Sequence, residues 1–439
     1  YPNRKEHIME SKYQNILKFF IGSGAGLILF FVPVTVNGRS SILIDQLVTS
    51  ISTNLPTAAL AISLAIIIAG AILPFINKTW NRSAMDVIFT LLKFIGVLCA
   101  VAGAFSLCSE AVNTAVFEML FPKVIIPGAL TVPIGCLLLT FITDYGILDF
   151  FGVLVRPIMR PLWKLPGRAA IIAVASFIGS FSVGIVATDN LYREGKFTHK
   201  EAAILVTGFA TVSMPFLVIA ANLLGLMPHW GLFFWSALII TFLTTAITVR
   251  LWPLCKVPET CWENAEYVEE AHEKGSLLKQ AWQAGLIQAQ NAPNLFASLW
   301  GNFKGGMIAI MNLLPLMMSL GTITLLLVNF TDVFDYIAWL FYPLTKLTMI
   351  PDEMAVAQAA AITVAEPVTS MVVASSAASI VSRFVVGVLA IGEIVFFTGT
   401  IPCILPSNID VSLGKLFIIW IERVVCIVAL ASIVGHLFL

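Results

Sequence analysis

Two glutamates stand inside stretches of sequence that are otherwise apolar. Glu366 lies beside Pro367 in a run of small and apolar residues, and Glu393 lies between Gly392 and Ile394. If these stretches cross a membrane, each carboxylate costs at least about 2.5–3.5 kcal/mol to insert, so something must compensate it. We interpret Glu366 as a substrate anchor or as a proton or cation site. The structural alternative is a carboxylate paired with a Lys, an Arg or a helix N-terminus.

Three further charged residues, in or beside the apolar stretches, have structural interpretations. Arg383 begins the stretch that carries Glu393, so a pairing with an arginine stays open for that glutamate. Glu422 and Arg423 are adjacent in the last apolar stretch and are interpreted as an internal ion pair.

Hydroxyl residues gather near the same interruptions of apolar sequence. Hydroxyls and freed backbone groups at helix breaks bind Na⁺ or small polar solutes in transporters, although a single Ser or Thr often bonds its own helix backbone instead. The predicted substrate- or ion-binding residues are Ser180, Ser182, Thr211, Ser213, Glu366, Thr369, Ser370 and Glu393. Thr188, Asp189 and Asn190 are weaker candidates, because Asp189-Asn190 fits the wet mouth of a hairpin equally well.

The sequence lacks the motifs that are typical of enzymes and of nucleotide- or metal-binding proteins. The sequence has no Walker motif, no G-x-S-x-G and no C-x-x-C, and its five histidines are isolated. The 25 basic residues balance the 25 acidic ones, which removes the basic surplus that nucleic-acid binding needs. We expect no enzyme activity, no bound metal and no cofactor, apart from Na⁺ or H⁺ as a coupling ion.

Composition identifies the setting of these residues. Of the 439 residues, 59% are hydrophobic and 11% are charged, against about 25% charged in soluble domains. About 20 apolar residues form a helix that crosses a bilayer. The predicted spans are Ile16–Val36, Asn54–Ile76, Ala84–Leu107, Val124–Thr143, Ala202–Leu226, Trp230–Leu251, Gly305–Asn329, Phe384–Cys403 and Leu416–Leu437. The segment of about Lys256 to Asn294 is polar and is predicted to be a helical loop.

Basic residues favour a cytoplasmic N-terminus, because positive charge concentrates in cytoplasmic loops. This topology requires the apolar stretch Ala169–Val186 to enter and leave on one side, since basic clusters flank both of its ends. Its middle, Ile178–Gly184, is small and polar, as a re-entrant hairpin needs. Close helix packing by small residues is the alternative explanation.

Two segments repeat one order of elements. Asp149–Pro157 and Asp335–Pro343 each follow a full span, look like amphipathic interfacial helices, and precede an Ala-rich stretch with a polar break. Counting spans places the two units on opposite sides, as in the inverted repeats of secondary transporters. The predicted fold is an all-α polytopic membrane protein with about nine transmembrane helices, two re-entrant hairpins and two interfacial helices in inverted repeats.

Several of these residues resemble a known family. Leu148–Gly152, Arg156–Leu162 and Leu165–Arg168 resemble the nucleoside-recognition gate domain, and Ser176–Gly184 with Leu191–Lys196 resembles the YjiH-type proteins of that group. The likeness covers about 140–225 well and about 305–405 more weakly. Gate domains also occur in concentrative nucleoside transporters, ferrous-iron transport proteins and spore-maturation proteins.

The nucleoside carriers imply two re-entrant hairpins, each paired with an unwound helix. Here these would be Ala169–Asn190 with the helix containing 207–215, and Met354–Ile380 with the helix containing 392–402. Ser180 and Ser182 stand where those carriers would have Gln and Glu at the first hairpin tip, so the solute stays open between a nucleoside, an amino acid and a short peptide.

We therefore expect a secondary active transporter of a small polar solute, coupled to Na⁺ or H⁺ and working by alternating access. A non-transporting assembly or signalling factor and an uncoupled channel are the alternatives. The predicted partners are the solute, the lipid bilayer of a prokaryotic inner membrane and further copies of the chain. The predicted units are scaffold helices 1–120, a first gate repeat 121–227, a scaffold helix and polar loop 228–300, a second gate repeat 301–410 and a final helix 411–439.

Overall fold

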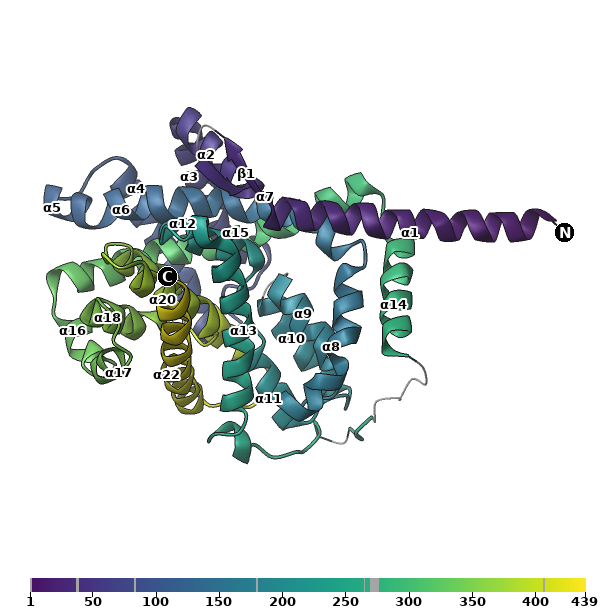
Figure 1. Cartoon of the computed structure of the whole chain (residues 1–439). Helices are drawn as coiled ribbons and strands as arrows, with labels where there is room; N and C mark the ends of the chain where they lie inside the picture. The colour runs from purple at the N-terminus through teal and green to yellow at the C-terminus, as the bar shows by residue number, and fades with distance from the viewer. Residues whose placement is uncertain are drawn as a thin grey trace.

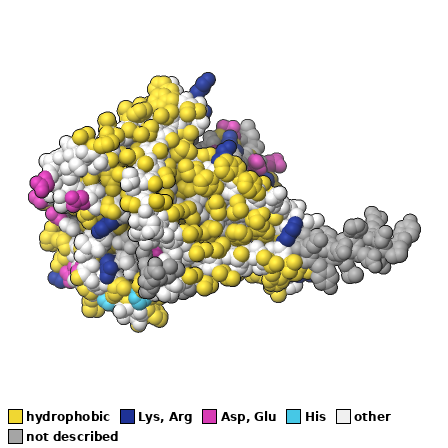
Figure 2. Space-filling view, turned by 90° about the horizontal axis from the view of Figure 1, so that it is seen from above, with side chains coloured by type: hydrophobic (Ala, Val, Ile, Leu, Met, Phe, Trp, Pro, Cys, Tyr) yellow, Lys and Arg dark blue, Asp and Glu magenta, His cyan; other side chains and the backbone are white. Residues whose placement is uncertain are grey.

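The long apolar segments form helices, because a helix satisfies its own backbone hydrogen bonds where lipid offers none. The computed structural model describes residues 2–36, 39–82, 84–178, 181–263, 265–268, 276–405 and 407–439. Within these residues, six helices are long and apolar enough to cross a membrane: Pro56–Ile76, Asp86–Ala104, Glu110–Thr143, Met227–Thr248, Leu295–Phe330 and Leu413–Phe438. Hydrophobic side chains cover much of the face shown in Figure 2. The predicted all-α polytopic membrane fold is confirmed.

The N-terminal part consists of a long helix, a small β-ribbon and the scaffold helices. Its elements are α1 (Pro2–Phe31), β1 (Pro33–Val36), β2 (Arg39–Ile42), α2 (Leu43–Asn54), α3 (Pro56–Ile76), α4 (Ala84–Ala104), α5 (Glu110–Val112), η1 (Asn113–Phe117), α6 (Glu118–Leu120), η2 (Phe121–Ile125) and α7 (Ile126–Thr143). Figure 1 shows α1 projecting from the body toward the N-terminus.

The predicted span Ile16–Val36 is wrong at its end. The helix stops at Phe31, and Pro33–Val36 pairs antiparallel with Arg39–Ile42. Pro33 cannot donate a helical hydrogen bond, and the β-branched residues that follow it favour a strand.

The middle of the chain holds a series of shorter helices, one further span and the polar segment. Its elements are α8 (Ile147–Trp163), α9 (Ala169–Ile178), α10 (Phe181–Arg193), α11 (His199–Gly208), α12 (Met214–Leu223), η3 (Met227–His229), α13 (Trp230–Thr248), η4 (Leu254–Lys256) and α14 (Leu277–Asn291). Thr198 and Glu201 form a capping box at the start of α11, where the side chain of each accepts from the backbone N–H of the other.

The same order of elements returns in the last third of the chain. It comprises α15 (Leu295–Phe330), α16 (Val333–Ala338), α17 (Tyr342–Leu347), α18 (Glu353–Thr363), α19 (Pro367–Ala374), α20 (Ile380–Gly392), α21 (Thr400–Ile404) and the final helix α22 (Leu413–Phe438). In both parts a long helix is followed by one or two shorter helices (α8, and α16 with α17), then by a pair of short helices and then by a broken helix.

The pair α9 and α10 folds back on itself. Arg168, just before α9, donates from Nη2 to the carbonyl of Val268 at 2.6 Å. The N–H of Val268 donates to the carbonyl of Gly195, just after α10, at 3.0 Å. Both ends of this pair therefore lie beside one residue, which makes it a helical hairpin.

The pair α18 and α19 does the same. Asp352 precedes α18, and its Oδ2 accepts from the N–H of Ser379 at 3.0 Å, beyond the end of α19. The N–H of Asp352 in turn donates to Ser382 Oγ at 3.3 Å. The second helical hairpin thus also begins and ends on one side.

Two of the predicted spans are broken in the middle. Ala202–Leu226 forms α11 and α12 with 209–213 between them, and Phe384–Cys403 forms most of α20 and α21 with 393–399 between them. The six long helices plus the shorter apolar helices Ile16–Phe31, Met214–Leu223 and Ile380–Gly392 account for the positions of the nine predicted spans.

The scaffold helices pack against α15 through glycines. A Cβ on Gly70 of α3 would overlap the carbonyl oxygen of Met311, and one on Gly96 of α4 would overlap that of Pro315. Small residues allow helix backbones to approach closely where lipid leaves packing as the main attraction. The two contacts fix α3 and α4 on one face of α15.

Replacing Gly70 with Ala tests this packing. We expect the added methyl group to force α3 away from α15 and to cost about 1–3 kcal/mol of stability, as overpacking does. The melting temperature in detergent measures the effect. Gly301→Ala on α15 is the matched control, because nothing lies within 4 Å of its added Cβ. Equal melting temperatures for the two variants would contradict the close approach.

Candidate functional site

The two helical hairpins and the two broken helices meet at one cavity of about 60 Å³. Each interrupted element contributes to its lining: Phe181 from the first hairpin, Ser213 from the α11–α12 break, Glu366 from the second hairpin, and Phe396 and Thr398 from the α20–α21 break. The long helices α7 and α15 complete the wall through residues that include Cys136 and Leu313. The repeats therefore converge on a single central site.

Glu366 occupies the tip of the second hairpin. It is 3% exposed and caps the N-terminus of α19, where Pro367 begins the helix. Its Oε2 accepts from the N–H of Thr369 and, at 2.8 Å, from the Thr369 hydroxyl. The helix-N-terminus alternative foreseen from the sequence is thus realised, yet the same carboxylate lines the cavity.

The break between α20 and α21 is held by specific backbone contacts. The N–H of Phe397 donates to the carbonyl of Val364 in the second hairpin at 2.8 Å. The Thr400 hydroxyl accepts from the N–H of Phe396 at 3.1 Å and donates to the carbonyl of Ile394 at 2.5 Å. Ile394 has a φ of +62°, a strained conformation for a β-branched residue. These hydrogen bonds hold the break in a defined conformation, so it is not a frayed helix end.

The first repeat supplies the opposite wall. Ser213 precedes α12 in an extended conformation, and its hydroxyl does not cap the helix. Phe181, at the start of α10, meets Phe396 edge to face with ring centroids 5.8 Å apart. An aromatic pair therefore joins the first hairpin to the broken helix of the second repeat.

The other predicted hydroxyl residues are more dispersed. Ser180 lies outside the described residues, and Ser182 is half-buried on α10 and does not line the cavity. Thr211 is buried within the α11–α12 break, where its hydroxyl has no hydrogen-bond partner in the described part of the chain. Thr369 acts through Glu366, and Ser370 donates to the Pro367 carbonyl of its own helix at 2.7 Å.

Glu393 lies behind the cavity wall. It is fully buried, and Trp420 of α22 donates from Nε1 to its Oε2 at 3.3 Å and to the Thr363 hydroxyl at 3.2 Å. Its Oε1 has no hydrogen-bond partner among the described residues. Glu366 and Glu393 both belong to the second repeat, and only Glu366 lines the cavity.

The predicted Glu422–Arg423 ion pair is wrong. Arg423 is fully buried and donates to the carbonyl of Gly392 from Nε at 2.9 Å and to the Thr245 hydroxyl at 3.0 Å. Successive residues on a helix point about 100° apart, so Arg423 faces the protein while Glu422 lies on another side of α22. Arg383 likewise bonds the carbonyl of Leu224 at 3.1 Å and forms no ion pair with Glu393 in the described structure.

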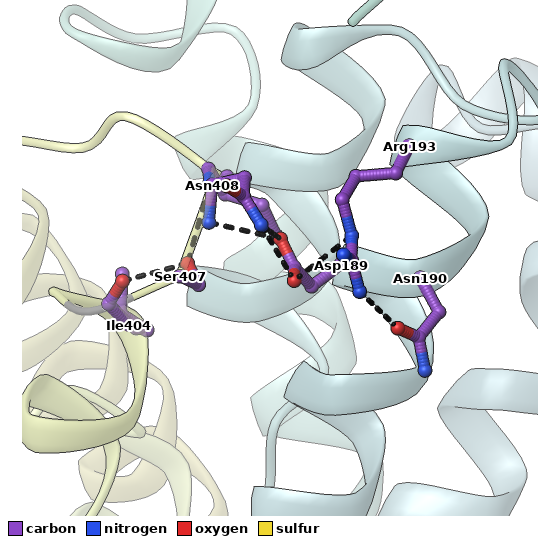
Figure 3. A network of polar contacts seen from close by, with 7 residues as sticks. Asp189, Asn190, Arg193, Ile404, Ser407 and Asn408 are labelled. Carbon is purple, nitrogen blue, oxygen red and sulfur yellow. Dashed lines mark hydrogen bonds and ion pairs between the residues drawn. The ribbon is translucent and has the colours of Figure 1, made fainter.

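A polar network joins the first hairpin to the chain after α21 (Figure 3), and none of its labelled residues lines the cavity. Asn408 donates to Asp189 Oδ1 from its backbone N at 2.9 Å and from Nδ2 at 3.1 Å. Arg193 lies 3.6 Å from the same carboxylate and also donates to Asn190 at 2.6 Å. Asp189 therefore forms a contact with Asn408 between the two repeats, which we call the repeat latch, whereas among the described residues Asn190 bonds only within its own helix.

The lining chemistry defines what the cavity accepts. Glu366 is the one charged group among the described lining residues, and no Lys or Arg accompanies it there. Ser213 and Thr398 add hydroxyls, and Phe181 with Phe396 adds an aromatic wall. The described residues contain no cluster of three His, Cys, Asp or Glu that could hold a metal ion. The site therefore suits a hydrogen-bond donor, a proton or a monovalent cation.

Two of these lining groups were missed by sequence reasoning. Thr398 and the Phe181–Phe396 pair line the cavity, yet neither was singled out as a site residue. The polar signal was present for Thr398, which lies in Thr398-Gly399-Thr400 within an apolar stretch. Both phenylalanines lie in segments that the sequence predicts to be interrupted, Ile178–Gly184 and 392–402, but their residue type gave no signal of a site.

Thr369→Val tests the support of Glu366. The change keeps the shape and removes the hydroxyl donor, and a hydrogen bond to a charged group contributes about 1.5–3 kcal/mol. We expect a clear fall in melting temperature. Ser370→Ala is the control, because that equally buried hydroxyl bonds only its own helix. A fall of the same size in both variants would contradict a special role for Thr369.

Comparison with known proteins supports the resemblance seen in the sequence. The chain is 27% identical to an uncharacterized protein of Alkalihalophilus pseudofirmus over 99% of both chains. Solved structures of CNTnw in an inward-facing substrate-bound state and of a CNTnw variant in an intermediate state have TM-scores of 0.38 and 0.42. They are 13% and 12% identical, covering 96% of this chain and 89% and 98% of theirs. Residues 129–227 match the model of the Gate family, described as nucleoside recognition.

Proposed function

We propose that the protein is a secondary transporter that moves a small polar solute through the central cavity by alternating access. The observation that carries this proposal is the convergence of two helical hairpins and two broken helices on one buried carboxylate. Broken helices that meet between repeats are the usual substrate and ion sites of secondary transporters. The Gate family's description supports a nucleoside among the candidate solutes, beside an amino acid or a short peptide.

Glu366 is the proposed solute anchor. Its Oε2 is held by Thr369, so the carboxylate presents a fixed acceptor to a hydroxyl or amino group of the solute. Ser213 and Thr398 add hydrogen bonds, and the ring pair of Phe181 and Phe396 offers an apolar surface for a base or an apolar side chain. A polar solute with one flat or apolar face matches this arrangement.

The charge of the cavity explains why solute transport would be coupled to an ion. A carboxylate removed from water without a cationic side chain requires compensation. Na⁺ or H⁺ supplies it, and the solute then binds a neutralised site. Movement of the loaded site across the membrane carries the ion with the solute, which couples transport to the ion gradient.

The cavity must open to bind any of these solutes. Its volume of about 60 Å³ has room for a few waters, whereas ligand pockets are typically about 300–1,000 Å³. The first hairpin is tied to the second repeat by Phe181–Phe396 and by the repeat latch. We infer that the structure is a closed state and that the hairpins move against the scaffold of α7 and α15.

The remaining predictions from the sequence are part of this proposal. The basic loops support a cytoplasmic N-terminus in a prokaryotic inner membrane and re-entry of both hairpins from opposite sides. Exposed apolar side chains on α3 and α4 provide surface for lipid or for another copy of the chain.

Glu366→Gln tests the anchor. We expect the variant to fold, because Gln still accepts from Thr369, and to lose gradient-driven uptake by at least tenfold, because the charge that binds the coupling ion is gone. Uptake of radiolabelled nucleosides, amino acids and dipeptides into proteoliposomes under imposed Na⁺ and H⁺ gradients measures this.

Glu422→Gln is the matched control, since that carboxylate also lies in a spanning helix but does not line the cavity. Gradient-driven uptake at the wild-type rate by Glu366→Gln would show that Glu366 is not part of the binding site. Wild-type uptake that ignores both gradients would indicate an uncoupled channel, and no flux of any solute would favour an assembly or signalling factor.

Asp189→Ala tests the repeat latch. Hydrogen bonds to a charged group contribute about 1.5–3 kcal/mol, so their loss should raise the open population roughly 10- to 100-fold. We expect Cys136, which lines the cavity, to react faster with a small thiol reagent when the other six cysteines are replaced by serine. Glu194→Ala is the control, because Glu194 pairs with nearby Lys196. Unchanged labelling in Asp189→Ala would contradict the latch.

A further inference from the structure

A second polar cavity lies in the scaffold, between the end of α3, the start of α4 and the middle of α15. Its volume is about 170 Å³, larger than that of the central cavity. Water needs only about 10–15 Å³ of such space per molecule, so a polar group of several atoms fits. Its lining includes the polar residues Asp86, Lys93 and Asn312.

Lys93 is the unusual member of this lining. It lies in the middle of the apolar helix α4, is 6% exposed, and donates from Nζ to the side-chain oxygen of Asn312 at 2.8 Å. A lysine ammonium has three donors, and Asn312 offers a neutral acceptor. No carboxylate forms an ion pair with Lys93 within the described ranges. A buried ammonium whose protein partner is an amide calls for an anion.

Asp86 and Lys93 place a negative and a positive group at different depths in the cavity. It precedes Lys93 by seven residues, which corresponds to about 10 Å along a helix at ~1.5 Å per residue, and it lines the same cavity near the start of α4. The positive group therefore lies deeper along the helix than the negative one. In an aminophospholipid the phosphate likewise lies nearer to the acyl chains than the amino group does.

An apolar surface borders the cavity on its outer side. Phe75, Ile76 and Phe94 are exposed by 43%, 70% and 42%, and Trp80 stacks on Phe75 with centroids 5.5 Å apart. Aromatic side chains of this kind favour the boundary between headgroups and acyl chains. A ligand that enters the cavity with its polar head can lay its apolar chains on this surface.

We propose that the Lys93 cavity binds the headgroup of an aminophospholipid, with the phosphate at Lys93 and the amino group at Asp86. The lipid would join α3, α4 and α15 beneath the Gly70 and Gly96 contacts. Asn312 faces this cavity, while Ala309 and Leu313 of the same helix line the central one. The lipid therefore stabilises α15, the helix that lines the central cavity opposite the hairpins. This inference does not depend on what the central cavity transports.

The test is the melting temperature of delipidated protein in detergent with added lipid. We expect phosphatidylethanolamine to raise it by several degrees, and more than phosphatidylcholine, whose quaternary amine donates no hydrogen bond to Asp86. Lys93→Met should lose most of the rise for both lipids, and Asp86→Asn should remove the difference between them. Lys304→Met is the matched control, because Lys304 is exposed on α15 outside the cavity.

Three outcomes would overturn the proposal. They are equal shifts from the two lipids on the wild-type protein, an unchanged shift in Lys93→Met, and an equal shift from soluble phosphoethanolamine, which would indicate a pocket for a free solute. Native mass spectrometry of the wild-type protein gives a second readout should Lys93→Met fail to fold. Preferential retention of phosphatidylethanolamine is expected there, and equal retention of both lipids would contradict the site.

Discussion

The central constraint on this protein concerns helices that are interrupted inside the membrane, where no water is available. The backbone N–H and C=O groups left unpaired at each interruption must find other hydrogen-bond partners. Glu366 does this at the tip of the second hairpin, where its carboxylate accepts from the N–H and the hydroxyl of Thr369. Thr400 does it at the α20–α21 break, and the Phe397–Val364 hydrogen bond ties the two interruptions together. The site exists because polar groups stabilise irregular backbone at both interruptions, and one of these groups, Glu366, also lines the cavity.

This arrangement divides the molecule into a wall and the elements that close against it. Helix α15 is the shared wall, since one of its faces receives α3 and α4 through glycines and another lines the central cavity. The hairpins contribute short helices, an aromatic contact and a polar latch, all of which can separate without unfolding a long helix. A rigid wall and separable short elements are what alternating access requires.

Sequence alone predicted the parts of this structure that depend on hydropathy and on the placement of charge. The apolar runs located the long helices, and the basic clusters around Ala169–Val186 led to the first hairpin. Glu366 was identified as a lining residue because an unpaired charge in an apolar run needs an explanation.

The parts that failed depend on side-chain direction and on tertiary partners. Adjacent Glu422 and Arg423 suggested a pair, but the helix turns them to different sides, and Arg423 bonds carbonyls instead. Lys93 was hidden in an apolar run, because hydropathy averages over one charge and cannot foresee Asn312, 219 residues away. Thr398 became part of the site only once the α20–α21 break placed it there.

The most direct test of the account is a distance measured between a hairpin and the wall. Spin labels at Val183 on α10 and Gly301 on α15, both at exposed positions, report this distance by pulsed electron paramagnetic resonance in nanodiscs. Alternating access predicts at least two distance populations whose ratio shifts when Na⁺, H⁺ or a transported solute is added. One unchanging distance under all of these conditions would contradict a moving hairpin and, with it, the proposed transport cycle.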